Sequence, residues 1–265
     1  ELLINEASSR IYNNITNSYP CHIHGNGGPS RKLYLNKLEN YLMDNWSSIS
    51  GYNTKNISNP NSLKQSITLY IQVINTTNDI MVTKQIYQMI YQNIIELKKY
   101  VKHINVIYAD YLEIGNDRNK GLDDAYNKTN IDYYWLVDTT YILTNKQTLL
   151  HMIITNKAII TPLMTKPNQL WSNFWGELDN NGWYLKSFDY NDIVENRKKG
   201  CWNVPYIAGN IVIQGSILKE VRGYFSTDIN PNYDTYMAFS HNCRTNNKFM
   251  YVINFKEYGY INSNL

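Results

Sequence analysis

The order of apolar and polar stretches along the chain predicts strands that alternate with helices. Ile67 to Ile74 (ITLYIQVI) is a β-branched run typical of a buried strand, and Thr83 to Val101 carries apolar residues at the spacing of one helix face. The same order continues with strands at Ile104 to Tyr108, Tyr133 to Val137 and Ala158 to Leu163, and with helices at Arg118 to Asn127 and Gln147 to Ile154. This alternation predicts an α/β fold with a doubly wound, mostly parallel sheet and helices on both faces.

The first 50 residues have a different pattern. Leu2 to Asn17 and Leu33 to Trp46 both show helical spacing, and a glycine-rich loop at His22 to Lys32 separates them. Ser48 to Ser62 is rich in Ser, Asn, Gly and Pro, which is typical of a linker. We therefore expect three parts: one unit at residues 1–50, a linker at 51–62 and a larger domain at 63–265.

Composition and charge exclude several classes of function. The 265 residues carry a net charge of +3, and no basic tract of the kind that binds nucleic acid occurs. No run reaches the ~18 apolar residues of a membrane span. The three cysteines form no CxxC motif, which argues against a zinc site. The chain also lacks GxSxG, a P-loop and the His-x-Asp/Glu motif of iron oxygenases.

Asp138 directly follows the apolar strand YYWLV. It should therefore lie at the C-terminal edge of the sheet, where doubly wound sheets bind their ligands. A second carboxylate two residues later would complete an Asp-x-Asp pair able to hold Mg²⁺ or Mn²⁺ against a nucleotide diphosphate. This chain has Thr140 at that position, so Asp138 is a candidate catalytic and metal-binding residue without its partner. The alternative is that Asp138 caps the following segment or is hydrogen-bonded at the strand end.

Two other segments could hold the phosphates of a nucleotide. Arg118 and Asn119 open a predicted helix, and the N–H groups of a helix N-terminus together with an arginine can bind a diphosphate. In the loop His22 to Lys32, glycines free backbone amides for a phosphate, and one histidine could ligate a metal. The alternatives are an ordinary helix start and a surface turn with exposed histidines.

Aromatic residues and carboxylates gather in the second half of the chain. Asp192 could act as a base or position an acceptor, or it could be a solvated loop carboxylate. The aromatic residues either form a surface that stacks on sugars or pack as an aromatic subcore. Those selected for a substrate surface are Trp171, Trp175, Trp202 and Tyr206.

Taken together, several blocks resemble the accessory domain of the procollagen lysyl hydroxylase/glycosyltransferase family. The blocks, in the family's order, are DYYWLVDTTYILTN, IITPLMTKPNQLWSNFWGEL, GWYLKSFDYNDIV, CWNVPYIAGNIVIQG and FMYVINFKEYGYI, and DRNKGLD resembles the family's Arg-Asn segment. The resemblance extends from about Leu63 to Ile261. Members carry an N-terminal glycosyltransferase domain, a central accessory domain of GT-A-like, Rossmann-like fold, and a C-terminal iron- and 2-oxoglutarate-dependent lysyl hydroxylase domain. The resemblance implies that residues 63–265 are the accessory domain.

The segment IHGNGGPSRKLYLNKLENYL resembles the end of the family's catalytic glycosyltransferase domain, which implies that residues 1–50 are the C-terminal part of that domain. By this match His24 would be a metal ligand, Gly25, Asn26 and Gly27 would lie against the UDP, and Lys32 would lie near the phosphates. The acidic metal motif of that domain is expected upstream of Glu1, and the hydroxylase domain is expected downstream of Leu265.

The resemblance implies three hypotheses about function. The first is a non-catalytic module that braces the flanking catalytic domains of the same polypeptide and presents collagen. The second is an active, metal-dependent UDP-sugar glycosyltransferase that acts on hydroxylysine of a collagen-like protein. The third is a collagen-binding module that uses the aromatic surface. In each case the parent enzyme would use Mn²⁺ and a UDP-sugar in the endoplasmic reticulum, and whether this chain binds either ligand stays open.

Overall fold

The computed structural model describes residues 2–5, 10–13, 15–16, 51–54, 60–76, 79–111, 117–128, 130–179 and 181–262. Near the N-terminus, β1 (Leu2–Asn5) pairs antiparallel with β2 (Arg10–Asn13). The helix predicted for Leu2 to Asn17 is therefore wrong. The apolar residues of this segment fit the spacing of a strand as well as that of a helix, and its isoleucine and tyrosine residues favour strands. The predicted helix at Leu33 to Trp46 and the glycine-rich loop lie outside the described residues.

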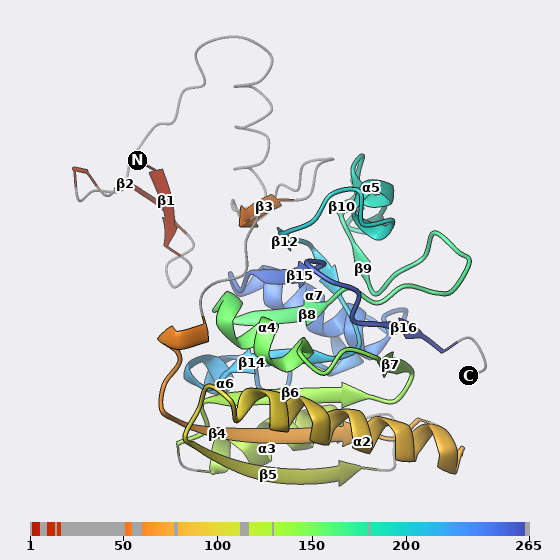
Figure 1. The fold of residues 1–265 in the computed structure, drawn as a ribbon. Coiled ribbons are helices and arrows are strands. Elements are labelled where there is room, and N and C mark those ends of the chain that lie inside the picture. The colour runs from red at the N-terminus through yellow and green to blue at the C-terminus, as the bar shows by residue number, and fades with distance from the viewer. Residues whose placement is uncertain are drawn as a thin grey trace.

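An eight-stranded sheet forms the centre of the domain (Figure 1). Its order is β3 (Gly51–Thr54), β12 (Cys201–Asn203), β15 (Met250–Ile253), β8 (Ile159–Pro162), β14 (Ile211–Gln214), β6 (Tyr133–Asp138), β4 (Ser66–Ile74) and β5 (His103–Tyr111). Six of these strands run in one direction, and only β12 and β14 run against them. The predicted α/β fold with a mostly parallel sheet is confirmed.

Helices cover both faces of this sheet (Figure 1). On one face lie α2 (Ile80–Leu97) and α4 (Thr148–Thr155), and on the other lie α3 (Asp117–Asn127), α5 (Tyr190–Val194), α6 (Leu218–Val221) and α7 (Thr235–Thr245). Successive residues of a strand point to opposite faces. In β6, Trp135 and Val137 join the core under α2 and α4, while Tyr134 and Leu136 join the core on the other face.

Short elements connect and extend these layers. β7 pairs with β16, β9 with β13, and β10 with β11, all antiparallel. The bounds are η1 (Pro60–Ser62), β7 (Tyr141–Leu143), β9 (Phe174–Trp175), β10 (Glu177–Leu178), β11 (Tyr184–Leu185), β13 (Tyr206–Ile207), η2 (Gly215–Ile217), η3 (Thr227–Ile229) and β16 (Gly259–Ile261). Gly51–Thr54, within the predicted linker, forms edge strand β3. The domain boundaries themselves stay a prediction.

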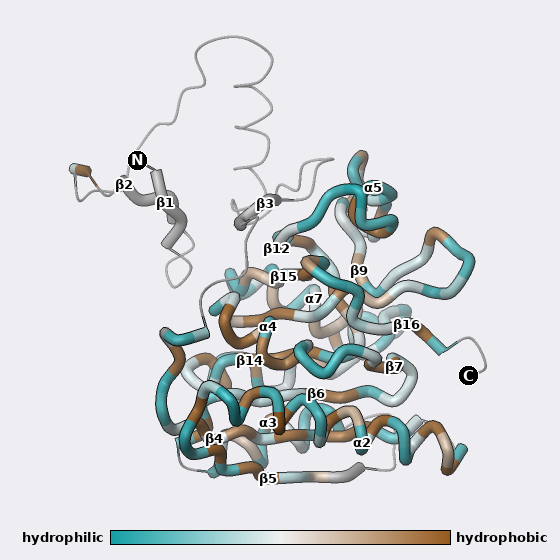
Figure 2. The backbone as a smooth tube through the Cα atoms, viewed as in Figure 1, coloured by the Kyte–Doolittle hydropathy of each residue, from teal (hydrophilic) through white to brown (hydrophobic). Residues whose placement is uncertain are grey.

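Helix α2 shows how the sequence pattern becomes structure. Asp79 caps the helix, because its carboxylate accepts the N–H groups of Met81 and Val82. Ile86, Ile90 and the later residues of the same face are buried against the sheet. Figure 2 shows the resulting alternation of hydrophobic and hydrophilic residues along the helix. Across the described residues, no helix is both long and apolar enough to cross a bilayer.

We expect Gly121→Ala to destabilise the domain by about 1–3 kcal/mol, because it overpacks a filled core. A Cβ at this position in α3 would lie 2.0 Å from Oε1 of buried Gln72. Gln72 cannot move easily, since it donates to the carbonyl of Asp117 and accepts from the hydroxyl of Tyr134. The free energy of unfolding in denaturant measures the loss. Lys128→Ala, at an exposed position directly after the same helix, should change it by less than about 0.5 kcal/mol; equal losses would contradict this account.

We expect His151 to make stability depend on pH. Burial and then the charge of Lys256 lower the pKa of His151 to about 4, against the opposing charge of Glu96. The unfolded chain therefore binds a proton near pH 6.5 that the folded protein takes up only near pH 4. The neutral histidine contributes full stability above pH 6.5, and this contribution falls as the pH drops toward 4.

The test compares unfolding free energies of the wild type and of His151→Gln at several pH values. The variant should lose less stability on acidification, by up to about 1.4 kcal/mol per pH unit between pH 6.5 and 4. His103→Gln, which replaces an exposed histidine on β5, should keep the wild-type dependence. Parallel curves for the wild type and His151→Gln would show that His151 is not the group responsible.

Candidate functional site

The carboxylate of Asp138 is buried at the C-terminal end of β6, where the sequence predicted a ligand site. Arg118, in the first turn of α3, lies against it: Nη2 is 2.6 Å from Oδ2 of Asp138, and both side chains are only 3% exposed. The structure thus brings together two of the predicted site residues. They contact each other in an ion pair rather than facing an open site.

Two more groups complete the hydrogen bonding of this carboxylate. The hydroxyl of Tyr236, at the start of α7, donates to Oδ2 at 2.7 Å, and the backbone N–H of Thr140 donates to Oδ1 at 2.9 Å. The side chain of Asn210 accepts the backbone N–H of Asp138 at 3.2 Å. Sequence reasoning missed Tyr236 and Asn210, because both come from distant segments and neither belongs to a motif that indicates this contact.

The charges in this cluster stabilise one another. Burial lowers the pKa of the Arg118 guanidinium, but its interactions with Tyr236 and with the Asp138 carboxylate outweigh this effect, so the pKa is raised. Burial also raises the pKa of Tyr236 well above its usual range, and the negative charge of Asp138 adds to this effect although Arg118 opposes it. The guanidinium carbon of Arg118 lies 4.6 Å from the centre of the Tyr236 ring, which adds a cation–π contact. Arg118 therefore stays charged and Tyr236 stays a hydrogen-bond donor.

Thr140, which stands at the second acidic position of the Asp-x-Asp pattern, is also hydrogen-bonded within the protein. The hydroxyl of Thr140 hydrogen-bonds to the hydroxyl of Thr76 at 2.9 Å, and the hydroxyl of Thr139 accepts the N–H of Thr76 at 2.8 Å. These contacts join the end of β4 to the end of β6. Within the described ranges, no three His, Cys, Asp or Glu side chains come together as metal ligands.

The residues around Asp138 do not fit a divalent cation. A metal there would need several oxygen ligands, whereas this site supplies one carboxylate that already accepts three hydrogen bonds. The guanidinium of Arg118 also occupies the side from which a cation would approach Oδ2 and would repel it. The prediction of a metal ligand at Asp138 therefore finds no support in the surrounding geometry.

The remaining predicted polar residues lie elsewhere. Asn119 accepts the backbone N–H of Phe225 at 3.1 Å and so ties α3 to the segment after α6. Asp192 on α5 forms surface ion pairs with Arg197 and Lys198, and the hydrogen bond from Arg197 is the main cause that lowers its pKa. The predicted loop residues lie outside the described residues, namely His24, Gly25, Asn26, Gly27 and Lys32.

The predicted aromatic surface divides into a buried and an exposed part. Trp202 is 5% exposed, and its indole N–H donates to Asn254 at 2.9 Å. Tyr206 is also buried, so these two residues belong to the core and not to a surface. Trp171 is 47% exposed and contacts Trp175 edge to face at 5.1 Å between ring centroids.

Two neighbouring segments carry exposed apolar side chains, one with Leu170 and Trp171 and the other with Leu185 and Phe188. We call this patch the aromatic surface; it consists of Leu170, Trp171, Trp175, Leu185 and Phe188. Lys186 links its two segments, because its ammonium group donates to the carbonyl of Leu170 at 2.9 Å. Phe188 is 84% exposed, the highest exposed fraction among these five side chains.

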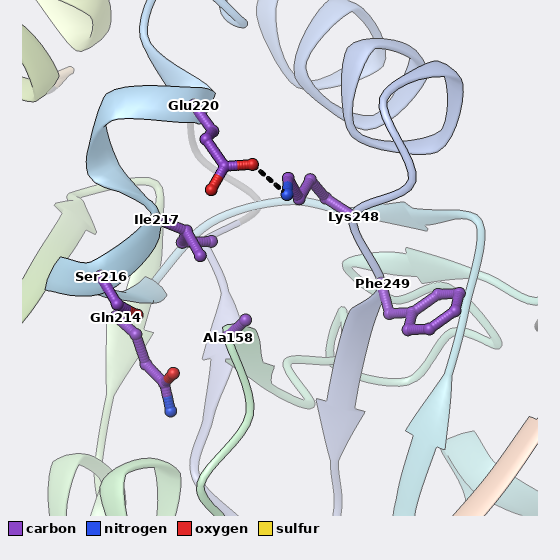
Figure 3. A pocket seen from close by; sticks show the side chains of 7 residues that line it. All are labelled: Ala158, Gln214, Ser216, Ile217, Glu220, Lys248 and Phe249. Atoms are coloured by element: carbon purple, nitrogen blue, oxygen red, sulfur yellow. Dashed lines mark ion pairs between the residues drawn. The ribbon is translucent and has the colours of Figure 1, made fainter. Parts of the chain in front are cut away.

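A small cavity of about 280 Å³ lies at the opposite edge of the sheet, where β8 and β15 begin (Figure 3). Lys248 points across it to form an ion pair with Glu220, and Ile217 and Phe249 contribute apolar walls. None of the predicted site residues lines it. The cavity is therefore separate from the cluster around Asp138.

Comparison with known proteins assigns the family. The family model "Glycosyltransferase family 25, N-terminal domain" matches residues 98–265, and the model "PLOD GT domain" matches residues 1–52. The chain belongs to the procollagen lysyl hydroxylase/glycosyltransferase family. Procollagen-lysine,2-oxoglutarate 5-dioxygenase 1 of Gallus gallus is 32% identical over 289 residues, which cover 98% of this chain and 39% of the relative. The procollagen lysyl hydroxylase and glycosyltransferase of Acanthamoeba polyphaga mimivirus is 30% identical, over 99% of this chain and 29% of the relative.

The chain thus spans well under half of the length of these relatives. Among solved structures, S. aureus TarS 1–349 in complex with UDP-GlcNAc aligns with a TM-score of 0.45 and 13% identity, covering 75% of this chain and 59% of that chain. A mutant of Drosophila β1,4-galactosyltransferase 7, solved with manganese, UDP-Gal and xylobiose, aligns with a TM-score of 0.45 and 9% identity, covering 73% and 68%.

We expect Arg118→Met and Asp138→Asn each to destabilise the domain by about 3–5 kcal/mol, because each leaves a buried polar partner uncompensated. The double variant should recover much of this loss, since both charges are then absent. A double-mutant cycle of unfolding free energies measures the coupling. Asp192→Asn, which breaks a surface pair, should leave the unfolding midpoint unchanged. Additive losses in the cycle would contradict the coupling.

Proposed function

We propose that residues 63–265 form a non-catalytic, glycosyltransferase-like module that supports the catalytic domains of a collagen-modifying enzyme and presents collagen to them. The observation that carries this proposal is the engagement of Asp138 by Arg118 and Tyr236. A metal-dependent sugar transferase needs carboxylates that reach a cation, because the cation neutralises the leaving diphosphate. In this domain the corresponding carboxylate is that of Asp138, and the guanidinium of Arg118 neutralises it.

The energetics also support a non-catalytic role. Freeing Asp138 for a metal would break a buried ion pair, which costs about 3–5 kcal/mol in comparable cases. Thr140 would supply only a neutral hydroxyl, and that hydroxyl is already bonded to Thr76. An active transferase remains the alternative hypothesis, and within the described residues no other carboxylate cluster favours it.

The proposed substrate is a collagen-like chain. Relatives in this family are procollagen-lysine,2-oxoglutarate 5-dioxygenases, and we extend a procollagen substrate to the present chain as part of the proposal. The exposed side chains of Trp171 and Phe188 support it, because proline-rich extended chains dock on aromatic surfaces. The same proposal places the parent enzyme in the secretory pathway and gives it Mn²⁺ and a UDP-sugar as ligands.

We expect calorimetric titration of UDP with Mn²⁺ into the chain to give no heat that depends on Asp138, even at millimolar UDP. The titration is repeated with Asp138→Asn and with His24→Ala, and circular dichroism confirms that each variant is folded. Micromolar binding that Asp138→Asn abolishes would contradict the non-catalytic proposal. Binding lost only with His24→Ala would place the nucleotide at the N-terminal unit and agree with the proposal.

A further inference from the structure

The sequence contains acceptor motifs for N-linked glycosylation that the proposed function does not use. The motif is asparagine, then any residue except proline, then serine or threonine, and it occurs five times. Asn14, Asn45 and Asn56 lie outside the described residues, whereas Asn75 and Asn127 lie within them. Because the chain is rich in asparagine, the motif alone does not identify an acceptor, and the surroundings of Asn75 and Asn127 must decide.

Asn127 is open to solvent. It is the last residue of α3, it is exposed, and Lys128 after it is exposed as well. The side-chain amide of Asn127 makes no hydrogen bond within the described part of the chain. The last carbonyl groups of a helix have no partner within the helix, so the chain can open there at low cost. A bulky glycan therefore finds an accessible attachment point at this position.

Asn75 has the opposite surroundings. It directly follows β4, it is half-buried, and its Oδ1 accepts from the hydroxyl of Thr139 at 3.5 Å. Thr76, the middle residue of this motif, donates its N–H to the hydroxyl of Thr139 at 2.8 Å and hydrogen-bonds to the hydroxyl of Thr140 at 2.9 Å. A glycan on Asn75 would separate the ends of β4 and β6, so we expect this motif to stay unmodified.

A restrained aromatic ring lies beside Asn127 in the sequence. Tyr126 is 38% exposed, and the guanidinium carbon of Arg222 lies 4.6 Å from the centre of its ring. Nε of Arg222 is in turn 2.6 Å from Oδ1 of Asp123, which restrains the guanidinium against α3. Such a ring next to the attachment point gives the apolar face of a first sugar a surface on which to pack.

The position of Asn127 keeps a glycan away from the other features of the domain. Helix α3 begins beside Asp138, with Arg118 in its first turn, and ends a few residues before β6 starts at Tyr133. Asn127 is therefore roughly 13 Å further along the helix axis than Arg118, toward the opposite edge of the sheet. The elements of the aromatic surface, β9, β10 and α5, lie on the other side of the domain from α3 (Figure 1). A glycan on Asn127 would leave both regions accessible.

We propose that Asn127 carries an N-linked glycan and that Asn75 does not. The inference rests on one part of the proposed function, which is the location in the secretory pathway. The donor is a lipid-linked oligosaccharide, and an oligosaccharide transferase of that pathway catalyses the step. Nδ2 of Asn127 forms a bond to the anomeric carbon of the first N-acetylglucosamine and gives up one proton to a base of the transferase. The bond from that carbon to the lipid diphosphate breaks, and the diphosphate leaves with the electron pair.

The test maps glycans on two samples: the 265-residue chain secreted from an N-glycosylating eukaryotic cell, and the protein purified from its own cells. Peptide N-glycosidase in heavy-oxygen water converts each glycosylated asparagine to a labelled aspartate, which mass spectrometry of the peptides detects. The peptide with Asn127 should carry the label in most molecules, and the peptide with Asn75 should carry none. Asn127→Gln and Thr129→Ala should each remove the label. Lys128→Ala, at the unrestricted middle position of the motif, should keep it.

The outcomes separate this inference from the proposed function. Label on other asparagines but not on Asn127 would overturn the inference and leave the secretory location intact. No label on any asparagine of the protein from its own cells would overturn the inference together with that location. Label on Asn75 would also overturn it, because the half-buried motif would then be an acceptor. A UDP response that depends on Asp138, measured separately, would contradict only the non-catalytic proposal.

Discussion

The buried ion pair between Arg118 and Asp138 determines what the C-terminal edge of this sheet can do. It connects β6 to α3 directly and to α7 through Tyr236, so three elements from distant parts of the chain meet at one carboxylate. Burying two charges is costly, and removing one of them alone is costlier still. The network is therefore maintained as a unit, and its presence closes the position at which a sheet of this type ordinarily offers a carboxylate to a ligand.

Closing this position leaves the rest of the edge open to other ligands. A cavity of about 570 Å³ lies beyond β8 and β15, and Lys256 and Glu257 line it with opposite charges. The edge thus has a part around Asp138 that the ion pair closes and an open part at the ends of β8 and β15.

The sequence predicted the repeating elements well and the contacts between them poorly. Ile67 to Ile74 and Tyr133 to Val137 are predominantly apolar and β-branched or aromatic, and both are strands; the helix from Thr83 is likewise present as α2. Leu2 to Asn17 mixes apolar residues with many polar ones, so its period is not decisive, and Leu2–Asn5 and Arg10–Asn13 form strands. The regularity of the pattern sets the limit in each case.

The contacts of the cluster around Asp138 could not be predicted from local sequence patterns. Asp138 and Arg118 were recognised because each stands at the start or end of a predicted element, but their contact depends on how α3 crosses the sheet. Tyr236 comes from 98 residues away, and no local pattern indicates that its hydroxyl reaches Asp138. The clustering of tryptophans in the sequence predicts a surface for Trp202, yet this residue lies on β12, whose residues are buried on both faces of the sheet. Pairing across distant segments is information that a single sequence does not carry locally.

The choice of arginine as the partner of Asp138 has a consequence of its own. A divalent cation at a carboxylate is exchangeable, since it dissociates and its binding depends on pH and concentration. The guanidinium of Arg118 is covalently attached, and its surroundings raise its pKa further, so it neutralises Asp138 permanently. Asp138 is therefore compensated from within the domain by a group that cannot dissociate, and Tyr236 holds the same oxygen from a third element.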